Sequence, residues 1–82
     1  MSDYINRADL IAHIETLQAK AKDTQLQLFW DGVISLVRRF PVTEIANDDY
    51  ISRSKLLAKL NKTVCNRLDV ERAIKDMPGY GT

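Results

Sequence analysis

DYINRADLIAHI, at residues 3–14, recurs almost unchanged as DYISRSKLLAKL at residues 49–60. Six of the twelve positions are identical, and two more exchange one aliphatic residue for another. A second pair of segments, VISLVRRFP (33–41) and VERAIKDMP (70–78), shares its apolar positions and its final proline. The chain is therefore a tandem repeat with units at 3–41 and 49–78, the second shorter by nine residues. Such a repeat is identified before other features because it sets the architecture.

Each repeat begins with the signals of a helix start. Asn6 and Ser52 precede the helical pattern, and their side-chain oxygens can accept hydrogen bonds from the first turn. The residue before each cap and the residue five positions later are apolar, which is the spacing of a hydrophobic staple: Ile5 with Leu10, and Ile51 with Leu56. The repeated residues are thus predicted to start helices.

The apolar periodicity predicts four helices. The first helix covers 7–21 and the third covers 53–61. The second starts at a cap on Asp23 or Thr24 and ends near Phe40, and the fourth ends at Met77. Pro41 and Pro78 stop the second and fourth. The start of the fourth stays open among three capping residues, Thr63, Asn66 and Asp69. Residues 42–49 are expected to be a short connector.

This pattern predicts an all-α fold, in one domain over 1–82, made of two tandem helical hairpins related by a pseudo-twofold axis. Residues 79–82 are expected to form a flexible tail. The apolar residues of the second helix span an arc of about 160°, so this helix should contact more than one neighbour. Because the second hairpin is shorter, the 26–30 end of that helix should be uncovered. A homodimer is expected to cover it.

Composition narrows the class of protein. The net charge is +1, with −3 in residues 1–49 and +4 in residues 50–82. No apolar run approaches the roughly 20 residues of a membrane span. The first residues lack the apolar region of a signal peptide, and Cys65 is the only cysteine, so we expect a protein of the bacterial cytoplasm with no disulfide and no membrane contact.

The residue types that carry chemistry do not form a recognisable motif. His13 is the only histidine, and neither it nor Cys65 has a second ligand at metal-binding spacing. The three glycines are scattered, so there is no phosphate-binding loop, and no nucleophile motif occurs. We therefore expect no metal, no cofactor and no enzymatic activity.

DNA binding is the second hypothesis. Residues 52–77 loosely match a helix-turn-helix in which the last helix would present Arg67, Arg72 and Lys75 to DNA. The turn of about six residues contains no glycine, where three or four residues are typical. Three acidic residues on the same helix, at 69, 71 and 76, would repel phosphate.

The segment DYISRSKLLAKL, together with the closing AIKDMP, resembles a pattern of small phage and prophage proteins of Firmicutes. In that pattern Ile-Ser-Arg-x-x-Leu-Leu opens a helix and an apolar–Pro pair closes the next one. The matching residues are Ile51, Ser52, Arg53, Leu56, Leu57 and Met77-Pro78. The resemblance implies a phage accessory protein, a class that includes inhibitors of bacterial defence such as anti-CRISPR proteins.

Protein binding is accordingly the first functional hypothesis, with a bacterial defence effector as the most concrete partner. The candidate surface combines the second helix with the basic side of the second repeat: Leu28, Trp30, Arg38, Arg39, Arg53, Lys59 and Arg72. Tryptophan and arginine are common interface anchors, although a buried core role for Trp30 is equally well supported. A structural role in virion assembly is the third hypothesis.

Overall fold

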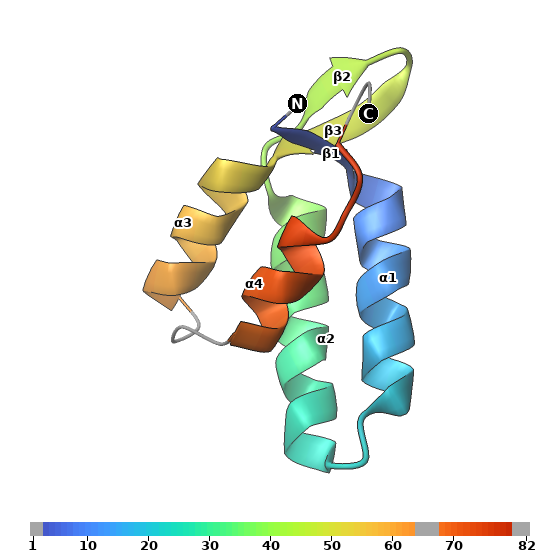
Figure 1. The fold of residues 1–82 in the computed structure, drawn as a ribbon, viewed down its shortest axis with the longest axis vertical. Helices are drawn as coiled ribbons and strands as arrows, with labels where there is room; N and C mark the ends of the chain where they lie inside the picture. Colours follow the sequence, from blue (N-terminus) through green and yellow to red (C-terminus); the bar gives the residue numbers. More distant parts are fainter. Residues whose placement is uncertain (1–2, 64–67, 80–82) are drawn as a thin grey trace.

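The computed structural model describes residues 3–63 and 68–79 (Figure 1). These residues form, in chain order, β1 (Tyr4–Asn6), α1 (Arg7–Lys20), α2 (Thr24–Arg39), β2 (Thr43–Ile45), β3 (Asp48–Ser52), α3 (Arg53–Thr63) and α4 (Leu68–Lys75). Cys65, Arg67 and all of the expected tail except Gly79 lie outside the described residues. The four predicted helices are present among them.

The expectation of an all-α fold is wrong. Three strands form an antiparallel sheet in the order β1-β3-β2 within the described part of the chain. They come from the residues that were interpreted as helix lead-ins and as an irregular connector. Figure 1 shows the sheet at one end of the helices, so the two hairpins are joined through a shared sheet as well as through helix packing.

The two copies of the DYI segment pair with each other. β1 and β3 run antiparallel with Ile5 opposite Ile51, and the flanking pairs are Tyr4 with Ser52 and Asn6 with Tyr50. This register is symmetric about the isoleucine pair, since each flanking pair maps onto the other when the repeats are exchanged. Both isoleucines are fully buried. Each copy therefore supplies the backbone partner that the other needs.

The expected connector is a β-hairpin. In the pairing of β2 with β3, Thr43 lies opposite Tyr50 and Ile45 lies opposite Asp48, which leaves only Ala46 and Asn47 in the turn. Both turn residues have positive φ, 52° and 69°. Positive φ at both central residues is the mark of a type I′ turn, whose twist matches that of the strands. The sequence carries Ala-Asn here in place of the usual Asn-Gly, which is why the turn was missed.

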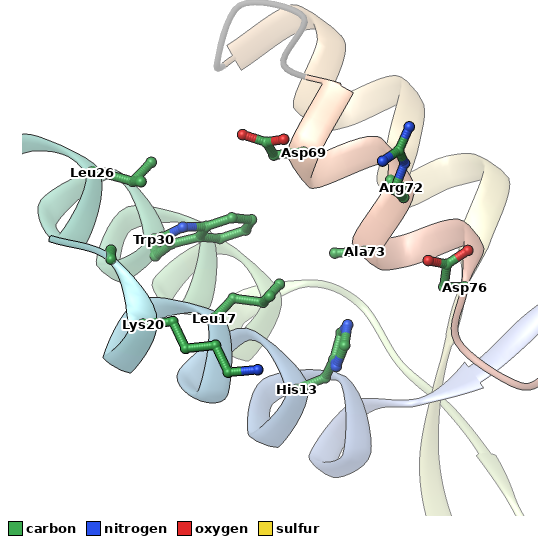
Figure 2. Close-up of a pocket in the computed structure, with 10 residues that line it drawn as sticks. His13, Leu17, Lys20, Leu26, Trp30, Asp69, Arg72, Ala73 and Asp76 are labelled. Carbon is green, nitrogen blue, oxygen red and sulfur yellow. The ribbon is translucent and has the colours of Figure 1, made fainter. Parts of the chain in front are cut away.

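The helices enclose one apolar core. Leu10 and Ile14 of α1, Val33 and Val37 of α2, and Ile74 of α4 are all buried. Trp30 is 3% exposed, and Figure 2 shows its indole between α1, α2 and α4. The prediction that this end of α2 would be uncovered is therefore wrong at Trp30, because α4 lies across α1 and α2. Leu28, in contrast, is 65% exposed, as expected.

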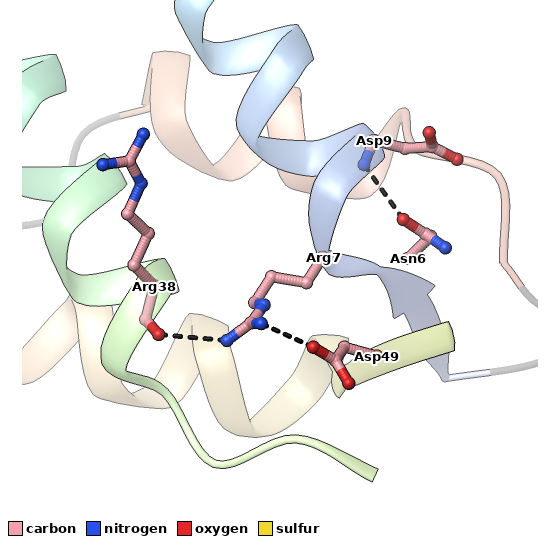
Figure 3. Close-up of polar contacts among 5 residues, drawn as sticks. All are labelled: Asn6, Arg7, Asp9, Arg38 and Asp49. Atoms are coloured by element: carbon pink, nitrogen blue, oxygen red, sulfur yellow. Dashed lines mark hydrogen bonds and ion pairs between the residues drawn. The ribbon is translucent and has the colours of Figure 1, made fainter. Parts of the chain in front are cut away.

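The predicted N-caps are present. The Asn6 side chain accepts a hydrogen bond from the Asp9 backbone N–H at 3.0 Å (Figure 3). Asp23, one of the two candidates for α2, accepts from Gln25 N–H at 3.0 Å. Ser52 Oγ lies 3.4 Å from the Lys55 nitrogen, a longer contact. A second group therefore shares the capping of α3.

That second group is Asp3, from the other repeat. Its Oδ1 accepts from Ser54 N–H at 3.0 Å, and its Oδ2 accepts from the hydroxyls of Ser54 and Ser52. The Asp3 carbonyl accepts from Arg53 N–H at 2.7 Å. The Ser52 hydroxyl first, and then the Ser54 donors and the Arg53 charge, hold the pKa of the Asp3 carboxyl below its ordinary value, against a smaller opposing effect of burial. Asp3 of the first repeat thus caps α3, the first helix of the second repeat.

The equivalent aspartate acts in the opposite direction. Asp49 accepts a hydrogen bond from the Arg7 guanidinium at 2.5 Å (Figure 3). A residue of the second repeat thus binds the start of α1, the first helix of the first repeat. The other guanidinium nitrogen of Arg7 donates to the Arg38 carbonyl at 3.0 Å. Arg53, its counterpart, donates to the Met77 carbonyl. Each arginine therefore satisfies a carbonyl of its own hairpin, Arg38 in the last turn of α2 and Met77 two residues beyond α4.

Candidate functional site

No group of three or more His, Cys, Asp and Glu side chains within residues 3–63 and 68–79 could hold a metal ion. In the same part of the chain, none of the helices has the length and apolar character that crossing a bilayer requires. The candidate sites are instead two open grooves on the surface.

The first groove, here the Trp30 groove, lies between α1, α2 and α4 and has a volume of about 350 Å³. Figure 2 shows Trp30 and Leu17 at its floor, with His13 of α1 pointing toward α4 and Lys20 lying along α1. The opposite side carries Asp69, Arg72 and Asp76. Two cations and two carboxylates therefore surround the floor. Their charges cancel, so this groove favours neither a cationic nor an anionic ligand.

The second groove, here the basic groove, lies between the end of α2 and α3 and has a volume of about 610 Å³. It is lined by Leu36, Arg39, Phe40, Pro41 and Lys59. The sequence places four of these together because α2 ends here: Phe40 is its C-cap, with its N–H donating to the Val37 carbonyl, and Pro41 prevents continuation. Leu36 and Phe40 are half-buried and pack against the core.

The charge on the walls of the basic groove has one sign. Arg39 and Lys59 are both exposed, and they come from different helices. The Arg39 Nε donates to the Ser35 carbonyl, at 3.4 Å, which holds the start of its guanidinium along α2. On α3 the exposed Lys55, Lys59 and Lys62 recur at spacings of four and three, so they share one helix face.

The structure separates the residues predicted to bind a partner. Arg39 and Lys59 meet in the basic groove, whereas Trp30 and Arg72 belong to the Trp30 groove. Leu28 is exposed but lines neither of these two grooves. Two members of the set are not available as surface anchors. Trp30 is in the core, and Arg53 is half-buried with its guanidinium bound to the Met77 carbonyl.

Arg38 and the residues predicted to bind DNA do not converge on one site either. Arg38 is exposed at the end of α2, and its own carbonyl is bound by Arg7. On α4, Arg72 and Lys75 are exposed, but the Lys75 ammonium lies 2.8 Å from the Glu71 carboxylate. The exposed acidic residues at 69 and 76 outnumber the one remaining cation, Arg72. The exposed side of α4 is therefore not a cationic surface.

Sequence reasoning missed the apolar part of the basic groove. Leu36, Phe40 and Pro41 were interpreted only as core and helix-stop residues. One signal in the sequence could have located the groove: residues 32–43 and 53–63 contain no acidic side chain, although acidic residues occur throughout the rest of the chain. That signal marks two segments, but only the fold places them side by side.

No known protein family, curated protein or solved structure matches the chain.

Proposed function

We propose that this protein acts by binding another protein through the basic groove, without catalysing a reaction. The observation that carries the proposal is the combination of an apolar floor, formed by Leu36, Phe40 and Pro41, with two cations from separate helices, Arg39 and Lys59. Protein interfaces combine these features, because apolar groups lose water in the centre while arginine and other polar groups orient the partner.

The size of the groove supports this function. A volume of about 610 Å³ can accept several side chains of a partner. The Trp30 groove is smaller, and its mixed charges offer less selectivity. The balanced charge of α4 gives no support to the DNA-binding alternative, so we do not propose it as a second function.

The partner that we propose to test first is a bacterial defence effector. This choice follows from the resemblance of the repeat to small phage proteins, whose site of action would be the host cytoplasm. Homodimer formation remains part of the proposal, with exposed Leu28 as its contact, although buried Trp30 is not part of the surface that would drive it. Light scattering at high concentration tests the dimer, and a monomer mass would contradict it.

The binding function is tested by comparing captured proteins across three variants. The wild type, the double variant Arg39→Glu/Lys59→Glu and the control Lys22→Glu/Lys75→Glu, whose exposed lysines line neither groove, are immobilised and exposed to a bacterial lysate. The two double variants change the net charge equally, but only the first alters the basic groove. We expect a captured protein that is lost with the groove variant and kept with the control. Capture that is equal with all three folded proteins would contradict the proposal.

A further inference from the structure

The residues that line the basic groove come from two segments of the chain that contain no acidic side chain. Six of the twelve Lys and Arg residues lie in segments 32–43 and 53–63, and none of the eleven Asp and Glu residues does. The rest of the chain therefore carries six basic against eleven acidic residues. A net charge of +1 conceals this separation. Positive charge is therefore concentrated in the last part of α2 and in α3.

The face of α3 that borders the groove extends this positive charge along the helix. Lys55, Lys59 and Lys62 follow each other at helical spacing and are exposed. Consecutive turns therefore each present an ammonium group. A partner that lies along α3 would meet a cation about once per helical turn, or roughly every 5–6 Å.

The groove itself distinguishes among anionic partners. A nucleic-acid backbone would pair with the lysines, but its phosphates would leave the Leu36, Phe40 and Pro41 floor in contact with water or with sugar. A peptide can instead place an aliphatic or aromatic side chain on the floor and carboxylates on the cations. The apolar and charged parts of the site are then both satisfied by one segment.

We infer that the basic groove binds an acidic amphipathic segment of the partner protein, with an apolar side chain on Leu36, Phe40 and Pro41 and carboxylates paired with Arg39 and Lys59. This inference rests on the proposed function and specifies its ligand. A helical segment fits best, because its acidic residues at i and i+4 repeat at the same interval as the lysines of α3. Electrostatic attraction between such partners accelerates their encounter and weakens with added salt.

A random peptide library displayed on yeast tests the inference with the full-length protein. Clones that bind the wild type are selected, and clones that also bind Arg39→Glu/Lys59→Glu are removed. We expect the remaining peptides to combine Asp or Glu with Leu, Ile or Phe at helical spacing. A synthetic peptide of that sequence should bind the groove variant roughly 10- to 100-fold more weakly than the wild type. The same peptide should bind the control Lys22→Glu/Lys75→Glu as it binds the wild type.

Two further probes separate the alternatives. A version of the peptide with its apolar residues changed to alanine should lose binding, because charge alone does not fill the floor of the groove. Duplex DNA should bind more weakly than the peptide at the same salt concentration. Tighter binding of DNA, or enrichment of neutral or basic peptides, would overturn the inference. If peptides fail in this way while a lysate protein still depends on Arg39 and Lys59, the proposed function stands and only its acidic ligand is refuted.

Discussion

Replacing Asp3 with alanine should destabilise the protein through a helix that starts fifty residues later. The Asp3 carboxylate accepts from Ser54 N–H at 3.0 Å and from the hydroxyls of Ser52 and Ser54, so it serves as an N-terminal cap of α3. Loss of such a cap costs about 0.5–2 kcal/mol. Because Asp3 is exposed, we expect a loss of about 1 kcal/mol at neutral pH, or about 4–8 °C in Tm for a domain of this size.

The pH dependence of this loss has a definite sign. The pKa of Asp3 is lowered in the folded protein by its hydrogen bonds, first of all from Ser52. A lowered folded-state pKa means that the carboxylate stabilises the fold fully above its unfolded value, roughly pH 4. The contribution then falls as the pH drops through the folded-state pKa. The difference between wild type and Asp3→Ala should therefore be present at neutral pH and shrink in acid.

Urea unfolding followed by circular dichroism measures both effects. The double variant Asp3→Ala/Ser54→Ala should lose less stability than the sum of the two single variants, by about 0.5 kcal/mol or more, because the residues are in direct contact. Asp48→Ala, another exposed aspartate, is the control and should change stability by less than about 0.5 kcal/mol. Additive losses, or a loss at Asp3 that does not change with pH, would refute the assignment of Asp3 as a cap of the opposite repeat.

Three other substitutions test the fold. Ile51→Ala should cost about 2–5 kcal/mol of unfolding free energy, because Ile51 is fully buried between the repeats, whereas exposed Leu28→Ala should be nearly neutral; equal effects in urea titrations would argue against the strand pairing. Ala46→Asn should stabilise the protein by about 0.5–1 kcal/mol, since asparagine tolerates the left-handed backbone better than alanine, and a lower Tm would contradict the turn assignment. Arg53→Met should cost about 1–2 kcal/mol by leaving the Met77 carbonyl without its donor, and an unchanged urea midpoint would refute that capping role.

The elements that the sequence predicted well are those whose signals are local. The start of α1 at Arg7 follows from Asn6, whose side chain caps a nitrogen three residues away. The end of α2 follows from Pro41, which has no N–H to continue the helix. The exposure of Leu28 follows from its position outside the apolar arc. Each of these depends on residues within one or two turns of each other, so periodicity and capping rules suffice.

The elements that were missed depend on distant partners. A three-residue strand such as Tyr4–Asn6 has too few positions to show a period of two, and it exists because Tyr50–Ser52 supplies its hydrogen bonds. The burial of Trp30 depends on α4, which lies across the first hairpin. The basic groove joins Phe40 to Lys59, and their proximity is a result of helix packing.

The sequence by itself determined that the chain is a repeat, where its first three helices begin, and which two segments lack acidic residues. Only the tertiary structure decided what the repeated residues do. The DYI segments pair with each other, the aspartates Asp3 and Asp49 each hold the opposite repeat, and Arg7 and Arg53 bind the carbonyls that end each hairpin. For the strand pairs and the two aspartates, the physical reason is that backbone N–H groups and a charged side chain left unsatisfied within one repeat find their partners in the other repeat. No local sequence pattern predicts such contacts, because folding must bring together residues that are up to about fifty positions apart in the chain.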